Sequence, residues 1–197
     1  MSYQETEIKL LVTDLHAMEK RLQENGAQLK KPRVYERNLR FDNQDGTFVK
    51  QGLVLRLRQD DRIRLTYKSA GEVVGDNIIS RFEAEVEVSD FDTMRVILEH
   101  LGYVPAMVYE KYRTTYELNG AEIVLDEMPY GNFVEIEGEA DVIRTLIPQL
   151  GLEDKPRFSA SYARLFDRVR RYLKLNIHDL TFENFQGVDV PIEAFNA

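Results

Sequence analysis

Charged and apolar residues alternate along nearly every stretch of this chain that has the composition of a β-strand. At the N-terminus, Glu5, Glu7 and Lys9 alternate with residues that include Ile8 and Leu10. Similar alternation recurs in VLRLR (54–58), RIRLTYK (62–68), RFEAEVEV (81–88) and NFVEIEG (132–138). Successive side chains of a strand point to opposite faces, so each segment predicts one charged and one apolar face. A single charged face is usually just exposed to solvent, but recurrence in almost every strand suggests that these faces meet.

The chain also contains an internal repeat. ETEIKLLV, a helix and VYERNLRFD are similar to FEAEVEVSD, a helix and VYEKYRTTYE. Each half reads as strand, helix, strand, strand, strand, with further helices expected at 140–150 and 159–174. Closing eight such strands into a ring removes the exposed sheet edges. The sequence therefore predicts an α+β fold, with an eight-stranded, mainly antiparallel β-barrel built from two similar halves and helices packed outside.

In such a barrel the helices cover the apolar faces from outside, so the charged faces line the interior. Unpaired buried charge is very costly, so this tunnel must be hydrated and must hold a ligand that matches both signs. Carboxylates favour a hard divalent cation, Mg²⁺ or Mn²⁺. Lysine and arginine favour a polyanion, and arginine offers forked donors to phosphate oxygens. A triphosphate with its metal ions satisfies both requirements.

Composition narrows the class of protein. The 197 residues suit one domain with additions, and the absence of cysteine excludes disulfides and thiolate metal sites. A net charge of −8 argues against general binding of nucleic acid. No apolar segment reaches membrane-spanning length and no apolar leader is visible, so we expect a cytoplasmic protein without membrane partners. A homodimer is left open.

The ordered series of charged motifs resembles the CYTH superfamily, the triphosphate tunnel metalloenzymes. The series runs ETEIK, LRLR, TYK, EAEVE, KYR, VLDE, VEIE and a late Ser161-Tyr162, and it spans roughly residues 3–170. Members of this superfamily include class IV adenylyl cyclases, thiamine triphosphatases and inorganic triphosphatases. The resemblance implies a tunnel domain over residues 1–175, and we expect residues 176–197 to form a C-terminal extension packed on it.

The resemblance also implies roles for individual residues. The expected metal ligands are Glu5, Glu7, Glu135 and Glu137. The expected phosphate-binding residues are Lys9, Arg56, Arg58, Lys68, Lys111 and Arg113. Lys9, Lys68 and Asp126 are expected to be catalytic. Glu83, Glu85 and Arg37 are expected to support the site, although Glu83 and Glu85 can equally be structural ion pairs in the wall.

Three functions are compared at this stage. The favoured one is metal-dependent hydrolysis of inorganic triphosphate or a small organic triphosphate such as thiamine triphosphate. The alternative is a class IV adenylyl cyclase that converts ATP to cyclic AMP and pyrophosphate; the motifs do not separate the two, but no adenosine site is visible. A non-catalytic binding module would not need four carboxylates for a metal. Many relatives carry a tyrosine before an aromatic–Asp pair in the second strand, whereas Arg40 precedes Phe41-Asp42 here.

Overall fold

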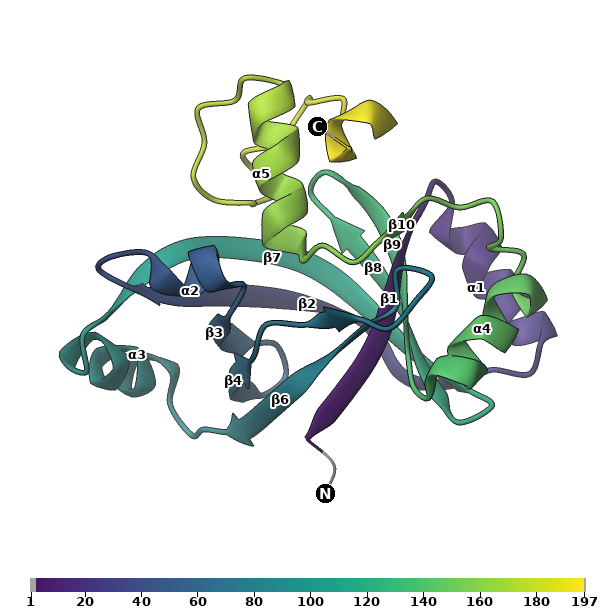
Figure 1. Ribbon diagram of the computed structural model, residues 1–197, viewed down its shortest axis with the longest axis horizontal. Helices are drawn as coiled ribbons and strands as arrows, with labels where there is room; N and C mark the ends of the chain where they lie inside the picture. The colour runs from purple at the N-terminus through teal and green to yellow at the C-terminus, as the bar shows by residue number, and fades with distance from the viewer. Residues whose placement is uncertain (1–2, 197) are drawn as a thin grey trace.

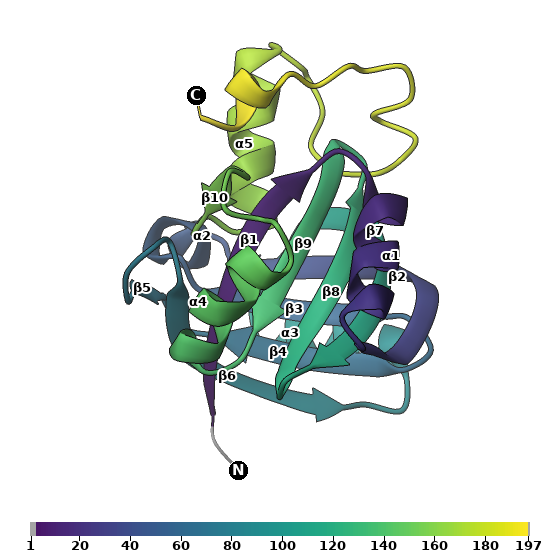
Figure 2. The same cartoon turned by 90° about the vertical axis from the view of Figure 1, so that its right-hand side faces the viewer.

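Eight antiparallel strands form a closed ring in the computed structural model, which describes residues 3–196 (Figures 1 and 2). The strands are β1 (Gln4–Val12), β2 (Gln28–Asn43), β3 (Val54–Gln59), β4 (Ile63–Lys68), β6 (Ile79–Glu87), β7 (Tyr103–Leu118), β8 (Ala121–Met128) and β9 (Gly131–Glu137). Their order is β1-β9-β8-β7-β2-β3-β4-β6, and β6 pairs with β1 to close the ring. The predicted barrel is confirmed. Two short strands, β5 (Glu72–Val73) and β10 (Arg157–Phe158), extend the sheet beside β6 and β1.

The helices lie outside the ring. They are α1 (Leu15–Glu24), α2 (Thr47–Gln51), α3 (Phe91–His100), α4 (Ala140–Gln149), α5 (Tyr162–Tyr172) and a 3₁₀ turn, η1 (Ile192–Phe195). Helices α1 and α3 occupy equivalent places in the two halves, and each starts at an aspartate. Asp14 accepts from Ala17 N at 2.9 Å, and Asp90 accepts from Thr93 N at 2.7 Å. Across residues 3–196, every helix is too short or too polar to cross a membrane.

Helix α2 was not expected, because five residues are too few to show a period. The buried carboxylate of Asp42 holds it in place. Its Oδ1 accepts from Phe48 N and its Oδ2 from Val49 N, both at 2.9 Å. These bonds satisfy the free N–H groups of the first helical turn.

The apolar faces of most strands pack outward against helices, as predicted. One cluster joins α1 and α4 to the outer face of β1, β8 and β9, and includes Leu22, Ile136 and Ile143 (Figure 2). A second places Leu98 of α3 against Leu39 and Leu57. The outer face of β6 differs, because its apolar side chains Phe82 and Val86 remain exposed.

The C-terminal segment packs beside α5 and on the ring (Figure 1). Leu180 N donates to Val108 O at 2.9 Å, and Glu110 N donates to Leu180 O at 3.0 Å. Further along, Phe185 and Phe195 join the aromatic cluster between α5 and the strands. These contacts hold α5 against one end of the tunnel, which matters for the site.

Replacing Ile136 with alanine tests the outward-facing core. Ile136 is fully buried between β9 and the helices that cover it, so Ile136→Ala removes apolar contacts and leaves a cavity. We expect the free energy of unfolding to fall by about 2–5 kcal/mol in a urea titration followed by circular dichroism. Ile97→Ala is the matched control, because Ile97 is 45% exposed on α3, and its effect should stay within about 0.5 kcal/mol. Equal losses in both variants would contradict this assignment of the core.

Candidate active site

The ring encloses a cavity of about 730 Å³ whose lining is dominated by charged side chains. Twelve lysines and arginines line it, against nine aspartates and glutamates. The chain as a whole carries a net charge of −8, so the sign of the interior is opposite to that of the molecule. A surplus of positive charge in a low-dielectric enclosure attracts anions.

The basic wall of the cavity comes from β3 and β7, where Arg56 and Arg58, and Lys111 and Arg113, occupy alternate positions of their strands. Arg56 Nη1 donates to Tyr109 Oη at 3.0 Å, and Arg58 Nη2 donates to Glu85 at 3.1 Å. In the ring, β2 lies directly between β3 and β7, so these strands form one wall and the four cations share it. All four expected phosphate-binding residues on these strands therefore face the cavity.

Glu36 lies in the middle of this wall and was not expected there. It is 1% exposed, and its carboxylate lies 3.5 Å from Lys111 Nζ and 3.6 Å from Arg58 Nη1. Burial would raise the pKa of Glu36, but Lys111, Arg113 and Arg58 outweigh it and lower the pKa. The sequence contained a usable signal: Leu39 and Phe41 face outward, so Glu36 and its alternate neighbours must face inward.

The same parity corrects the expectation for Arg37, which was wrong. Arg37 shares the outward face of β2 with Leu39, so its side chain is exposed and does not line the cavity. Its neighbours across the ladder are Gln59 and Glu110. On the inward face, Asn38 is completely buried, and its side-chain amide has no hydrogen-bond partner within residues 3–196. β2 therefore contributes Glu36 and Arg40 to the lining of the cavity, whereas Asn38 lies on the same face but does not line it.

Asp126 of β8 lies behind the basic wall and fixes two of its cations. It is 0% exposed. Its oxygens accept from Lys111 Nζ at 3.0 Å, Arg113 Nε at 2.7 Å and Tyr162 Oη at 2.8 Å. Burial and the Asp126 charge raise the pKa of Tyr162, which keeps this phenol protonated as a donor. Asp126 does not line the cavity, so its geometry is that of a positioning residue.

The acidic residues of β1 face the opposite side of the cavity, and each is paired with a cation. Glu5 accepts from Lys68 Nζ at 2.6 Å, and Lys9 forms an ion pair with Glu135. Glu135 also accepts from Arg113 Nη2 at 2.6 Å. Burial would raise the pKa of Glu135, but Lys9 and Arg113 lower it well below its usual range. The alternation of the N-terminal motif thus places acids and bases in one enclosed network.

Arg81 of β6 bridges Glu5 and Glu7 and was missed in the sequence. Its Nε donates to Glu5 at 3.2 Å, and its Nη2 donates to Glu7. The alternation of the strand indicates this placement, because Arg81, Glu83 and Glu85 occupy alternate positions of β6 and so share one face. Arg81 therefore provides the positive charge between two of the expected metal ligands.

Glu83 and Glu85 form ion pairs with other wall residues. Glu83 lies 2.8 Å from Lys68 Nζ, and Glu85 lies 3.1 Å from Arg58 Nη2. These contacts agree with the alternative that the two acids are structural counter-ions in the wall.

Glu137, the fourth expected metal ligand, stands at the edge of this network. Partial loss of water raises its pKa to about 8, and the charges of Glu5, Glu122 and Glu7 contribute to the increase. Excess negative charge of this kind is what a divalent cation relieves, and carboxylate oxygens are the donors that Mg²⁺ and Mn²⁺ prefer. The donor chemistry fits such a cation. Within residues 3–196, however, no three acidic or histidine side chains are gathered into a preformed metal site; Arg81 would have to release Glu5 and Glu7.

An antiparallel barrel with helices outside and a charged, anion-attracting interior defines a tunnel-type domain. The sequence model of the CYTH domain family matches residues 3–148, and the chain belongs to this family.

The relatives of this chain include both sequences and solved structures. A protein of Methanocaldococcus jannaschii named a putative adenylate cyclase is 29% identical over 135 residues, which are 68% of this chain and 75% of the relative. A Vibrio parahaemolyticus structure described as a putative adenylate cyclase has a TM-score of 0.72 at 19% identity, over 85% of this chain and 99% of that chain. A Hippeastrum protein, described as a putative adenylyl cyclase with a dominant triphosphatase activity, has a TM-score of 0.59 at 19% identity, over 83% of this chain and 95% of that chain.

Neutralising Asp126 tests its structural role. Asp126→Asn keeps the side chain's shape but removes the charge that Lys111 and Arg113 face in a buried position. We expect the free energy of unfolding to fall by at least about 2 kcal/mol in urea denaturation. The control is Asp141→Asn. The side chain of Asp141 is 96% exposed, so loss of its charge should lower the free energy of unfolding by less than about 0.5 kcal/mol. An Asp126→Asn protein as stable as the wild type would show that these cations do not depend on Asp126.

Proposed function

We propose that this protein is a divalent-metal-dependent hydrolase of triphosphates, which bind inside the barrel. The observation that carries the proposal is the arrangement of charge: a basic wall faces a group of carboxylates across one enclosed cavity. The phosphate-binding residues would be Lys9, Arg56, Arg58, Lys68, Lys111 and Arg113. The residues that would hold Mg²⁺ or Mn²⁺ are Glu5, Glu7, Glu135 and Glu137.

The residues of the chain would act mainly by electrostatic stabilisation. In hydrolysis, water attacks the terminal phosphorus and the diphosphate product leaves, while negative charge spreads over the phosphoryl oxygens. Arg56, Arg58 and Arg113 would bind these oxygens through forked N–H donors, and Lys9 and Lys68 would add positive charge near the β1 acids. Asp126 would act through Lys111 and Arg113 by fixing their orientation. A bound divalent cation would supply further neutralisation of the phosphate charge and polarisation of water.

Cyclisation of ATP is the second candidate, and the name of the M. jannaschii relative favours it. There the ribose 3′-hydroxyl would attack the α-phosphorus, and pyrophosphate would leave. The basic wall and carboxylates serve either reaction, since both neutralise a triphosphate. Hydrolysis remains the first proposal because it needs only water in addition. The Hippeastrum protein illustrates that a cyclase name and a dominant triphosphatase activity occur together on this fold.

Product analysis separates the two reactions. Purified protein would be incubated with inorganic triphosphate, thiamine triphosphate or ATP, each with Mg²⁺ or Mn²⁺, and phosphate, pyrophosphate and cyclic AMP would be measured. We expect phosphate release that EDTA abolishes, because the carboxylates cannot neutralise phosphate without a cation. Cyclic AMP as the dominant product from ATP, with negligible phosphate from inorganic triphosphate, would replace hydrolysis with cyclisation. Undiminished turnover in EDTA would remove the metal from the proposal.

Proton release tests the role of Glu137 in metal binding. Its pKa is raised to about 8, so at pH 7 its carboxyl group is mostly protonated and must lose its proton to bind Mg²⁺. Titration calorimetry in two buffers of different ionisation enthalpy should show release of about one proton per bound Mg²⁺ at pH 7. Release should approach zero at pH 9.5, where Glu137 is already ionised.

Glu122→Gln is the matched variant for this experiment. Glu122 helps to raise the pKa of Glu137, so the substitution should lower that pKa and reduce the proton release at pH 7 while leaving the expected ligands in place. A binding enthalpy that is the same in both buffers at pH 7 would exclude Glu137 from the metal site.

A further inference from the structure

Arg40 differs from every other basic residue that lines the tunnel. Eleven of the twelve have a carboxylate oxygen within 4.0 Å, whereas Arg40 has none among residues 3–196. The hydrogen bond that its side chain makes is from Nη2 to Leu53 O, at 3.1 Å. Arg40 is thus a partly buried cation without an ion-pair partner among residues 3–196. Asp42, whose charge raises the pKa of Arg40, lies beyond ion-pair distance.

The neighbours of Arg40 increase the need for an anion. Arg40 and Arg56 are directly opposite each other in the β2–β3 ladder, and like charges in that position repel. Burial lowers the pKa of Arg40, and the charges of Arg56 and Arg81 act in the same direction, whereas Tyr109 and Asp42 act in the opposite one; the net effect is a lowered pKa. An anion bound between these guanidinium groups would remove the repulsion and use their free N–H donors.

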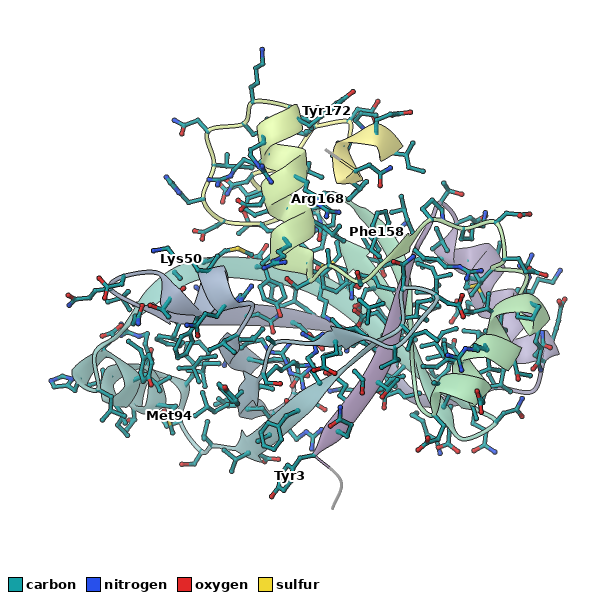
Figure 3. All side chains as sticks on the ribbon, viewed as in Figure 1. Tyr3, Lys50, Met94, Phe158, Arg168 and Tyr172 are labelled. Carbon is teal, nitrogen blue, oxygen red and sulfur yellow. The ribbon has the colours of Figure 1, made fainter. Side chains whose placement is uncertain are left out.

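A second cavity, of about 500 Å³, meets the tunnel at Arg40. The two cavities share Arg40, Val54, Arg81, Ser161 and Ala163 in their linings. Helices α2 and α5 contribute walls of the second cavity, and Lys50 and Arg168 mark these helices in Figure 3. A ligand in the tunnel can therefore extend past Arg40 into this space.

The second cavity suits an organic group better than phosphate. Its walls include the apolar side chains Phe41, Val49, Met107 and Phe166, and apolar walls of this kind are typical of sites for organic ligands. The tunnel, by contrast, is lined mainly by charged residues. An organic triphosphate would thus divide between the two spaces, with its phosphates in the tunnel.

The charge of the second cavity selects among organic groups. Five arginines line it, and the only acidic residue in the lining, among the described residues, is Asp167. Arg170 is paired with Asp167 at 2.8 Å, and Arg81 with Glu5 and Glu7. Among the described residues this leaves Arg40, Arg164 and Arg168 without a paired carboxylate. A cationic group such as the thiazolium ring of thiamine would be repelled. A neutral nucleoside would not, and arginine planes can stack on its base.

We propose that Arg40 binds the phosphoryl group that carries the organic part of the substrate, and that the second cavity holds this part as a neutral nucleoside. The inference rests on the proposed binding of triphosphates in the tunnel and names their class as nucleoside triphosphates. Arg40 is then a specificity-determining residue at the junction of two subsites.

Equilibrium binding measured in EDTA tests this inference without turnover. ATP, thiamine triphosphate and inorganic triphosphate would be titrated by calorimetry into the wild type, Arg40→Gln, Arg40→Lys, Arg37→Gln and Ala106→Phe. We expect the wild type to bind ATP at least ten-fold more tightly than thiamine triphosphate. Arg40→Gln should weaken ATP binding at least ten-fold, and Arg40→Lys less. Arg37 lies on the outer face of the same strand, so Arg37→Gln should change the affinity for ATP less than two-fold.

Ala106→Phe tests the second cavity separately, because Ala106 is an exposed residue that lines it and not the tunnel. The added ring should weaken ATP binding at least five-fold and leave inorganic triphosphate unchanged. The proposal is overturned if thiamine triphosphate binds as tightly as ATP, if folded Arg40→Gln binds ATP normally, or if Ala106→Phe affects both ligands equally or neither. Absence of hydrolysis in the product assay would defeat the proposed function, whereas these binding results stand independently of it.

Discussion

Compensation of charge inside a closed sheet is the constraint on which this structure depends. A charged side chain removed from water is costly unless it is paired, and the ring removes many of them from bulk water at once. Pairing is supplied across strands: Lys9 meets Glu135, Lys68 meets Glu5, and Asp126 meets Arg113. The first pair requires β1 to lie beside β9, and the second requires β6 to join β4 to β1, which is the contact that closes the ring. The ring therefore has to close for the charges in its interior to be neutralised.

The pairing of charges is incomplete at two places, and these places coincide with the proposed ligand sites. On the acidic side, partial loss of water and the nearby carboxylates raise the pKa of Glu137. On the basic side, burial and the charges of Arg56 and Arg81 lower the pKa of Arg40, against the opposite effect of Tyr109 and Asp42. Arg81 lies between the two, because it lines both cavities and pairs with Glu5 and Glu7. A cation on the carboxylates would free Arg81 for an anion, so the two ligands would favour each other's binding.

Much of the fold, but only part of the site, could be predicted from the sequence. Strands with period two predict which side chains share a face, so the inward positions of Glu5, Arg56 and Lys111 follow from pattern alone. Arg37 was misplaced and Glu36 and Arg81 were missed, although period two along β2 and β6 places Glu36 and Arg81 on the inward faces and Arg37 on the outward one. The second cavity could not be predicted, because α2, β5 and α5 form it from segments far apart in the chain.

An incompletely neutralised interior is costly, and this cost explains why the outside of the barrel carries large apolar clusters. The apolar clusters under α1, α3, α4 and α5 supply burial that does not depend on any ligand. They can therefore hold the ring closed while Arg40 opposes Arg56 and Glu137 remains near other acids. A fully neutralised tunnel would be more stable but would have no net attraction for a polyanion. The external core thus permits the internal charge imbalance on which the proposed binding depends.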